Sequence, residues 1–364
     1  MSMNQVVLIG NGFDLAHGLK TSYSDFILWY FKEVATLFNQ SGFYEDPLVS
    51  IHQIYQRRHF NEASFYKLSE VLKYLSNEEI DFRYISEFFR TIVSRNIKYN
   101  WVDIEYLYYQ ELLRHFKIIE KPGISETRID DFKTTLKQIN NCLDNLSKSL
   151  VNYLSTISVG SNIKLDTIQE HFTNIEKEQL KTKGSILLLN FNYTSVADLY
   201  FMHSSHKNVY KKIDIHGSIS DKSNPIIFGY GDDMEPNFQK LVNFNDNEIM
   251  LHMKSINYFK TLNYNSLMSY LESDGFVVNI MGHSCGLSDR LLLNRIFEHT
   301  NCRKIKIFYH QIDIERNDYT NKTIEIFRHF KNIVIAQERI VSFPNSKPLV
   351  PIRIPVLEPL VDVN

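Results

Sequence analysis

Polar residues directly follow several short apolar runs of this sequence, and they are the residues best suited to chemistry. They comprise residues 10–12, 190–194, 216–218, 229–233, and 282–284 with Asp289. In an open α/β sheet, ligands bind beyond the carboxyl ends of the strands. Polar residues end strands in most proteins, so each cluster alone is a weak signal. Five clusters, mostly in one sheet, predict a binding site.

His216 is the most informative single residue of these clusters. An imidazole has an ordinary pKa of about 6.5, so a histidine at a strand end is a natural general base at neutral pH. A histidine followed by glycine at such a place is more often structural than catalytic. Both interpretations of His216 stay open on the residue alone.

A glycine-punctuated turn joins the apolar run at residues 6–9 to an apolar-periodic segment, which predicts strand, tight turn and helix. Gly10 and Gly12 permit backbone angles and close approaches that a side chain would forbid. Free N–H groups at such a helix start form an anion site that suits a nucleotide diphosphate. The next glycine comes late, at Gly18, so the spacing is not the dinucleotide fingerprint, and a tight turn without a ligand explains it equally well.

The composition bounds the class of protein. The 364 residues suffice for one large domain or two ordinary ones, and 43% hydrophobic with 23% charged residues is a globular composition. A formal net charge of -2 gives no reason to expect nucleic acid or an anionic membrane as the main partner. Three scattered cysteines make neither a disulfide framework nor a four-cysteine zinc site. We see no leader and no apolar run of membrane length, so we expect a cytoplasmic protein.

Residues 26–183 are predicted to form a mainly helical block, because apolar residues recur there at intervals of three and four. Ser22 or Ser24 is expected to cap its first helix, and the Lys-Pro-Gly at residues 121–123 to separate two groups of helices. Asp103 is expected to cap another helix, with the Glu105 carboxylate near the positive end of the helix dipole.

From residue 184 on, short apolar runs end in Gly, Asn or Ser, which is typical of a parallel sheet buried on both faces. After residues 6–9, the predicted strands are 186–189, 213–215, 226–228, 276–281, 305–309 and 333–335. We therefore predict an α/β fold: a Rossmann-like parallel sheet with a large, mainly helical insertion after the first strand. The predicted domains are residues 1–25 with 184–340, the insertion at 26–183, and an extended proline-rich tail at 341–364.

The order of the clusters resembles one known family. Residues 9–19, Ile-Gly-Asn-Gly-Phe-Asp-Leu-Ala-His-Gly-Leu, closely match the signature of the abortive-infection AbiH family. The Trp-Val-Asp-Ile-Glu at residues 101–105 also matches, as do residues 190–192, 215–218, and 282–284 with Asp289. The resemblance covers nearly the whole chain and implies a defence role against phage.

The AbiH family is in turn distantly similar to SIR2-like proteins, which bind NAD in a Rossmann-type fold. This similarity implies a set of cofactor-binding residues at the two glycine-containing turns. They are Gly10, Asn11, Gly12, Phe13, Asp14, Gly282, His283, Ser284 and Asp289. The catalytic His-Gly of sirtuins corresponds to His216 and Gly217. The sirtuin Gln-Asn-x-Asp motif falls on residues 189–192, so Asn190 and Asn192 would orient the ribose and the attacking water.

The departures from the sirtuin pattern affect the expected chemistry. Asn192 stands where sirtuins have Asp, and an amide cannot take a proton, although it can hydrogen-bond a ribose hydroxyl. Asp14 would repel a diphosphate, so it is expected to face a ribose hydroxyl or cap the helix. The Cys-x-x-Cys pairs of the sirtuin zinc module are missing, which favours simple hydrolysis over deacylation, and no metal is expected. The resemblance thus implies an NAD glycohydrolase in which His216 draws the proton.

Two other functions stay open. A sensor would bind NAD, ADP-ribose or a related nucleotide in the same pocket without cleaving it, and the missing aspartate favours this role. A metal-dependent nuclease would hold Mg²⁺ with Asp232, Asp233 and Glu235, together with Asp103 and Glu105, although a solvated acidic loop explains these residues more simply. A homo-oligomer and a phage-derived trigger are further partners left open, while a membrane or nucleic acid is not expected.

Overall fold

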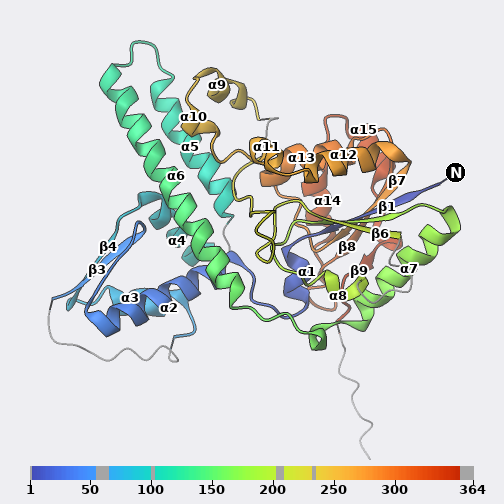
Figure 1. The fold of residues 1–364 in the computed structure, drawn as a ribbon, viewed down its shortest axis with the longest axis horizontal. Helices are drawn as coiled ribbons and strands as arrows, with labels where there is room; N and C mark the ends of the chain where they lie inside the picture. Colours follow the sequence, from blue (N-terminus) through green and yellow to red (C-terminus); the bar gives the residue numbers. More distant parts are fainter. Residues whose placement is uncertain (1, 55–64, 100–102, 202–208, 232–234, 353–364) are drawn as a thin grey trace, which may run out of the picture.

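The computed structural model describes residues 2–54, 65–99, 103–201, 209–231 and 235–352. Its centre is a six-stranded sheet in the order β6-β5-β1-β7-β8-β9 (Figure 1), in which every pair of neighbours is parallel. The strands are β1 (Asn4–Ile9), β5 (Ile186–Asn190), β6 (Tyr210–Asp214), β7 (Phe276–Met281), β8 (Cys302–Tyr309) and β9 (Lys347–Pro348). The predicted α/β fold with a parallel sheet is confirmed.

β1 lies in the middle of this sheet, although both of its neighbours come much later in the chain. All six of its residues are buried, as expected for a strand covered on both faces. The register places Ile9 beside Asn190 of β5 and beside Met281 of β7. Parallel strands end at the same edge, so the segments that follow these three strands meet there.

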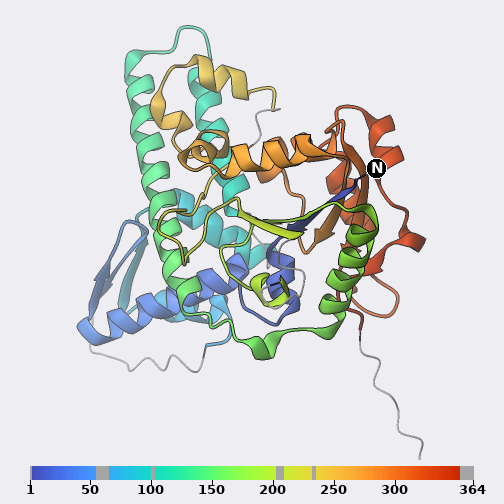
Figure 2. The ribbon, with the colours of Figure 1, turned by 45° about the vertical axis from the view of Figure 1, so that its right-hand side comes forward.

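Helices cover both faces of the sheet (Figure 2). Successive side chains of a strand point to opposite faces, and β1 shows this division. Val7 and Ile9 share a core with α1 (Asn11–Ala16), α7 (Asp166–Thr182) and α8 (Asp198–Phe201). Val6 and Leu8 share another with α12 (Asn263–Ser273), α13 (Arg290–Phe297), α14 (Tyr319–Phe327) and α15 (Ile333–Arg339).

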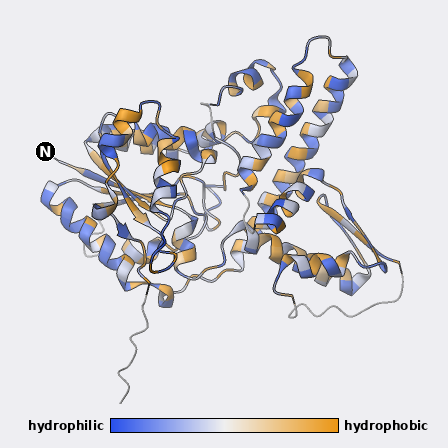
Figure 3. Cartoon of the chain, turned by 180° about the vertical axis from the view of Figure 1, so that it is seen from behind, coloured by the Kyte–Doolittle hydropathy of each residue, from blue (hydrophilic) through white to orange (hydrophobic). Residues whose placement is uncertain are grey.

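The chain between α1 and α7 forms a layer of helices around a further core, to which buried residues of the segment 228–253 also contribute. Its helices are α2 (Tyr23–Ser41), α3 (Leu68–Leu75), α4 (Glu87–Tyr99), α5 (Ile104–Ile119) and α6 (Glu126–Ser155). Hydrophobic and hydrophilic residues are interspersed along these helices (Figure 3), as in helices that bury one side. None of the helices in the described ranges is long and apolar enough to cross a membrane.

The expected helix boundaries are confirmed in this layer. Ser22 caps α2, since its hydroxyl accepts a hydrogen bond from the backbone N–H of Asp25 at 3.1 Å. Asp103 caps α5 in the same way, accepting from the N–H of Tyr106 at 2.9 Å. The break at residues 121–123 separates α5 from α6. Local capping chemistry therefore defines these ends as the sequence predicts.

A small antiparallel sheet in the same layer was not predicted. It consists of β2 (Phe43–Glu45), β3 (Val49–Gln53) and β4 (Ile80–Tyr84). Runs of three to five residues are too short for a clear alternation of apolar and polar positions. The tight connection before β3 is instead made by Asp46, whose Oδ1 accepts from the N–H groups of Leu48 and Val49, at 2.8 Å each.

In the parallel sheet, two predicted strands are wrong, and one strand was not predicted. Residues 226–228 form a loop, in which the N–H of Ile227 donates to the carbonyl of His216. Residues 333–335 open α15, because the side chain of Asn332 accepts from the N–H of Val334 and caps a helix there. β9 lies in the segment predicted as an extended tail and pairs with β8. Residues 353–364 of that segment lie outside the described residues.

Candidate functional site

The glycine turn after β1 packs against the loop after β7. The N–H of Gly12 donates to the carbonyl of Gly282 at 2.8 Å, and the N–H of Phe13 donates to the carbonyl of Gly10 at 2.8 Å. A Cβ at Gly12 would lie 2.7 Å from the oxygen of Gly282, and one at Gly10 would overlap the Cα of His283. Close backbone contact inside the protein therefore requires these glycines. A diphosphate at this turn would need the loop after β7 to move.

Asp14 lies behind this turn and joins the ends of β1 and β5. It is 1% exposed. Its Oδ1 accepts from Nδ2 of Asn192 at 2.8 Å, and its Oδ2 accepts from the hydroxyl of Thr194 at 2.6 Å. The same Asn192 amide donates to the carbonyl of Gly10 at 3.0 Å. Burial raises the pKa of Asp14 to about 6, although the hydrogen bonds from Thr194 and Asn192 act in the opposite direction.

Replacing Asp14 by asparagine is expected to stabilise the protein at neutral pH. Protonated Asp14 is tolerated in the folded protein, but the buried carboxylate is costly. The folded state therefore loses stability relative to the unfolded state as the pH rises from about 3.8, the ordinary pKa of Asp, to about 6 and above. Asn keeps both hydrogen bonds, because the Thr194 hydroxyl can accept instead of donate. The free energy of unfolding should rise by about 3 kcal/mol at pH 7 and by less than about 1 kcal/mol at pH 4. Urea unfolding at both pH values measures this, and an equal gain at both would contradict the assignment.

The two asparagines after β5 have different roles. Asn190 uses its whole amide in the turn: Nδ2 donates to Oδ1 of Asp214 at 2.7 Å, and Oδ1 accepts from the N–H of Asn192 at 3.1 Å. Asn192 commits its Nδ2 to Gly10 and Asp14, but no described residue donates to its Oδ1. Of the two predicted residues, Asn192 thus has an acceptor left for a ligand, while Asn190 shapes the turn.

Two histidines converge on Asp289, which ends the short helix η5 (Leu287–Asp289) after β7. Nε2 of His216 lies 3.1 Å from Oδ1 of Asp289, and Nε2 of His283 lies 3.5 Å from Oδ2. The Tyr258 hydroxyl lies 3.2 Å from the same Nε2 of His216. Nδ1 of His283 accepts from the N–H of Cys285 at 3.0 Å, which places a proton of His283 on Nε2, facing Asp289. The structure therefore brings His216 to His283 and Asp289, which come much later in the chain.

His216 is held neutral and oriented. Burial lowers its pKa to about 4, and the charge of Lys254 adds to this effect, although Asp289 opposes it. Since Nε2 faces a carboxylate, the single proton of the neutral ring lies on Nε2. No described residue hydrogen-bonds to Nδ1, so its lone pair is available as a base. The ring of Phe191 packs edge-on against His216, with 5.1 Å between centroids.

A buried lysine completes the site, and no motif in the sequence indicates it. Lys254, the first residue of α11 (Lys254–Asn257), is 0% exposed. Its Nζ lies 2.8 Å from Oδ1 of Asp289 and 3.0 Å from Oε2 of Glu105. We call Glu105, Lys254 and Asp289 the ion triad. In the sequence-based prediction, Glu105 lies near the helix dipole or, in the nuclease alternative, at a metal site. Its match to the AbiH pattern is the signal that could have pointed to this site.

Charge in the ion triad is concentrated on Lys254 and Asp289. Burial opposes both charges, but Lys254 and His216 hold the pKa of Asp289 well below its usual range. Asp289 and Glu105 together keep the pKa of Lys254 above its usual value against the same burial. Burial raises the pKa of Glu105 to about 8, although Lys254 opposes this. A second negative charge is costly here, so Glu105 is the member that most readily takes a proton.

Other predicted site residues lie apart from this cluster. Ser284 and Asn11 are exposed, and Oδ1 of Asn11 accepts from the hydroxyl of Thr21 at 2.6 Å. The side chain of Phe13 is fully buried in the core between α1 and α7. These three residues shape or flank the turns. Among the described residues, no hydrogen bond joins any of them to the His216 side chain.

Within the described part of the chain, the carboxylates considered for a nuclease do not form a metal site. Asp232 and Asp233 lie outside the described residues. Glu235 accepts from the hydroxyl of Tyr109 at 2.9 Å and from the N–H of Asn237 at 2.7 Å. Within the described ranges, no group of three or more His, Cys, Asp or Glu side chains is arranged to hold a metal ion. In the ion triad, the Lys254 ammonium already supplies the cation.

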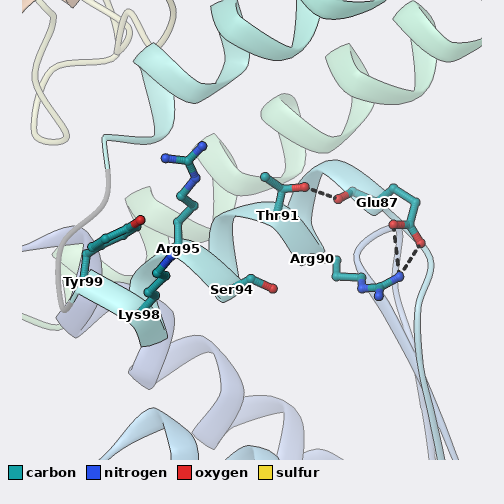
Figure 4. A pocket seen from close by; sticks show the side chains of 7 residues that line it. All are labelled: Glu87, Arg90, Thr91, Ser94, Arg95, Lys98 and Tyr99. Carbon is teal, nitrogen blue, oxygen red and sulfur yellow. Dashed lines mark hydrogen bonds and ion pairs between the residues drawn. The ribbon is translucent and has the colours of Figure 1, made fainter.

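A surface hollow of about 520 Å³ lies elsewhere, along α4 (Figure 4). It is lined by Glu87, Arg90, Thr91, Ser94, Arg95, Lys98 and Tyr99. All seven residues belong to one helix, and Arg90 pairs with Glu87 at 3.3 Å. Long, solvated side chains on one helix offer no buried polar group to orient a ligand, so we assign no function to this hollow.

Comparison with known proteins gives one match. A family model described as "Bacteriophage abortive infection AbiH" matches residues 6–311. These residues include the glycine turn, Asn192, His216 and the whole ion triad. Comparisons with curated proteins and with solved structures find no match.

Proposed function

Because this chain belongs to the bacteriophage abortive infection family AbiH, which implies a role in abortive infection, we propose that it acts by hydrolysing the nicotinamide–ribose bond of NAD. The observation that carries the proposal is His216, a neutral imidazole with Nε2 committed to Asp289 and Nδ1 left as a base. The depletion of NAD would stop an infected cell, and the expected place of action is the cytoplasm.

The proposed reaction needs one base and one leaving group. The bond between the nicotinamide nitrogen and ribose C1′ breaks, its electron pair leaves with neutral nicotinamide, and a ribosyl cation-like transition state forms. A water oxygen bonds to C1′ as Nδ1 of His216 takes its proton. Asp289 stabilises the resulting imidazolium, and Oδ1 of Asn192 orients the water or a ribose hydroxyl. The products are ADP-ribose, nicotinamide and one proton.

We also propose that residues 26–183, with their helices and small sheet, are an insertion in a SIR2-like sheet. The residues of the reacting end fit this proposal, since His216 and Asn192 each have an acceptor atom to which no described residue donates. The turn at residues 10–14 fits a diphosphate only after the loop at residues 282–283 has moved, because the N–H of Gly12 already donates to the carbonyl of Gly282 in that loop. In this proposal Asp289 serves the reacting end, because it contacts His216.

The direct test is to incubate the purified protein with NAD and separate the products by chromatography. We expect nicotinamide and ADP-ribose in equal amounts, with the loss of NAD equal to either. Release of AMP instead would indicate cleavage of the diphosphate and would reject the proposal. Intact NAD with saturable binding in calorimetry would support the sensor, and intact NAD without binding would reject both.

The packing of the glycine turn specifically favours the sensor as the second candidate. Gly10 and Gly12 already contact the loop at residues 282–283, and His216 is only 4% exposed. A ligand that enters must displace this loop, and such a movement would report occupancy to the adjoining layers. Turnover that is lost on replacing His216 separates the two functions.

A further inference from the structure

Lys254 and Tyr258 come from one short segment and contact the two members of the His216–Asp289 pair. Lys254 opens α11, and Tyr258 opens the adjoining η4 (Tyr258–Lys260). Residues four apart in a helical segment lie on the same face. Nζ of Lys254 lies 2.8 Å from Oδ1 of Asp289, and the Tyr258 hydroxyl lies 3.2 Å from Nε2 of His216. One segment therefore holds both the base and its carboxylate.

The backbone places this segment relative to Asp289. The N–H of Lys254 donates to the carbonyl of Tyr230 at 2.8 Å, and the N–H of Tyr230 donates to the carbonyl of His252 at 3.1 Å. The next residue, Gly231, donates its N–H to the carbonyl of Ser288 at 3.0 Å. The loop at residues 229–231 thus bridges α11 and η5, which fixes the distance between Lys254 and Asp289.

Glu105 holds Lys254 from the opposite side. Its Oε2 accepts from Nζ of Lys254 at 3.0 Å, and its Oε1 accepts from the N–H of Gly229 at 2.9 Å. Glu105 lies in the first turn of α5, so the helical layer supplies one side of the ion triad. A buried ion pair often adds little net stability compared with apolar residues of similar size. An orienting role accounts better for three charged groups at this place.

We propose that Lys254 is the positioning residue of this site: it fixes the Asp289 carboxylate so that His216 keeps its proton on Nε2 and its lone pair on Nδ1. Glu105 keeps Lys254 in place. The inference rests on the proposed function, since the positioned base is the one that would act on NAD. The ionisable groups that face His216 are Asp289 from η5, Lys254 from α11, Tyr258 from η4 and His283 after β7.

The test is Lys254→Met, which keeps the length of the side chain and removes its charge. We expect kcat for nicotinamide release to fall by about 100-fold with KM unchanged, because the base is misplaced while the binding residues remain. The pKa of His216, followed by NMR of ¹⁵N-histidine-labelled protein, should rise, because Lys254 contributes to keeping it low. A folded variant with the wild-type kcat and the wild-type His216 titration would overturn the proposal.

A double variant separates positioning from charge neutralisation. Lys254→Met alone leaves the Asp289 carboxylate and the Glu105 carboxyl group without their cation, and Glu105→Gln with Lys254→Met leaves only Asp289 as a buried acidic group. We expect the double variant to melt closer to the wild type and still to have the low kcat. Recovery of kcat together with stability would show that Lys254 only neutralises charge. Lys306→Met is the matched control, because Lys306 pairs with Glu178 on the surface at 2.8 Å, and it should change neither measurement.

The NMR measurement keeps the two proposals apart. If the wild type releases no nicotinamide, the proposed function fails, but the ¹⁵N shifts of His216 at neutral pH still decide the positioning role, because they report which ring nitrogen holds the proton. A proton no longer confined to Nε2 in folded Lys254→Met supports the positioning role. A proton that stays on Nε2 rejects it, even if the pKa of His216 rises through the loss of the Lys254 charge alone.

Discussion

Replacing His216 by glutamine is expected to reduce nicotinamide release from NAD by about 10²- to 10⁴-fold, the usual contribution of a general base. Glutamine is chosen because its Nε2 reaches the position of the imidazole Nε2 and can still donate to Asp289. It offers no atom that takes up a proton at neutral pH. The fold should therefore survive, while the chemistry is lost.

A matched control is His171→Gln. His171 is half-buried, and its Nε2 contacts the carbonyls of Pro348 and Leu349, away from the ion triad. We expect wild-type release from this variant. Both variants should show the wild-type far-ultraviolet circular dichroism. Equal loss in both, or full release by His216→Gln, would remove His216 from the mechanism.

The pH profile of the wild type offers a check on the same residue. A base acts in its neutral form, and the pKa of His216 is lowered to about 4. Release should therefore be constant between about pH 6 and 8 and fall only as the pH approaches this value.

Gly282→Ala is expected to cause the largest loss of stability of any single methyl addition at the glycine turns. Gly282 has a φ of 75°, which costs an alanine about 1–2 kcal/mol. The added Cβ would also lie 2.6 Å from the carbonyl carbon of Gly12 and overlap the backbone nitrogen of Phe13. Backbone atoms cannot rotate away as side chains do, so we expect a further loss of about 1–3 kcal/mol.

Gly18→Ala serves as the reference, because it carries the backbone strain without the close contact. Gly18 has a φ of 77°, almost the same as Gly282, but a Cβ there meets nothing within 4 Å. The difference between the two variants in the free energy of unfolding therefore measures the close contact of the two turns. Urea unfolding of both gives this difference. A value near zero would mean that the turns are loosely packed and free to admit a ligand.

The sequence predicted the parts of this fold that local chemistry decides. The apolar runs at residues 6–9, 186–189 and 276–281 are strands because they are long and buried on both faces. The cap at Asp103 depends only on its immediate neighbours. Residues 333–335 have the same apolar character, but the Asn332 side chain starts a helix there. The division at residue 183 stays a prediction, and α7, which ends just before it, packs against the sheet.

The site was harder to predict, because its geometry arises from tertiary packing. His216, His283 and Asp289 could be placed at one edge of the sheet, since parallel strands end together. Lys254 follows none of the predicted strands, and no motif distinguishes a buried lysine from a solvated one. Only the backbone bridge at residues 229–231 brings it to Asp289.

The central position of β1 makes the order of synthesis matter. The first strand leaves the ribosome early, but its neighbour β7 and the Asp289 carboxylate come much later. At 5–20 residues per second, about 15–60 s pass before residue 289 has been made. Until then, β1 lacks one neighbour, and His216 lacks the group that orients it. A nascent chain, or one interrupted before residue 289, therefore lacks the His216–Asp289 pair, which would delay the proposed activity until most of the chain has been made.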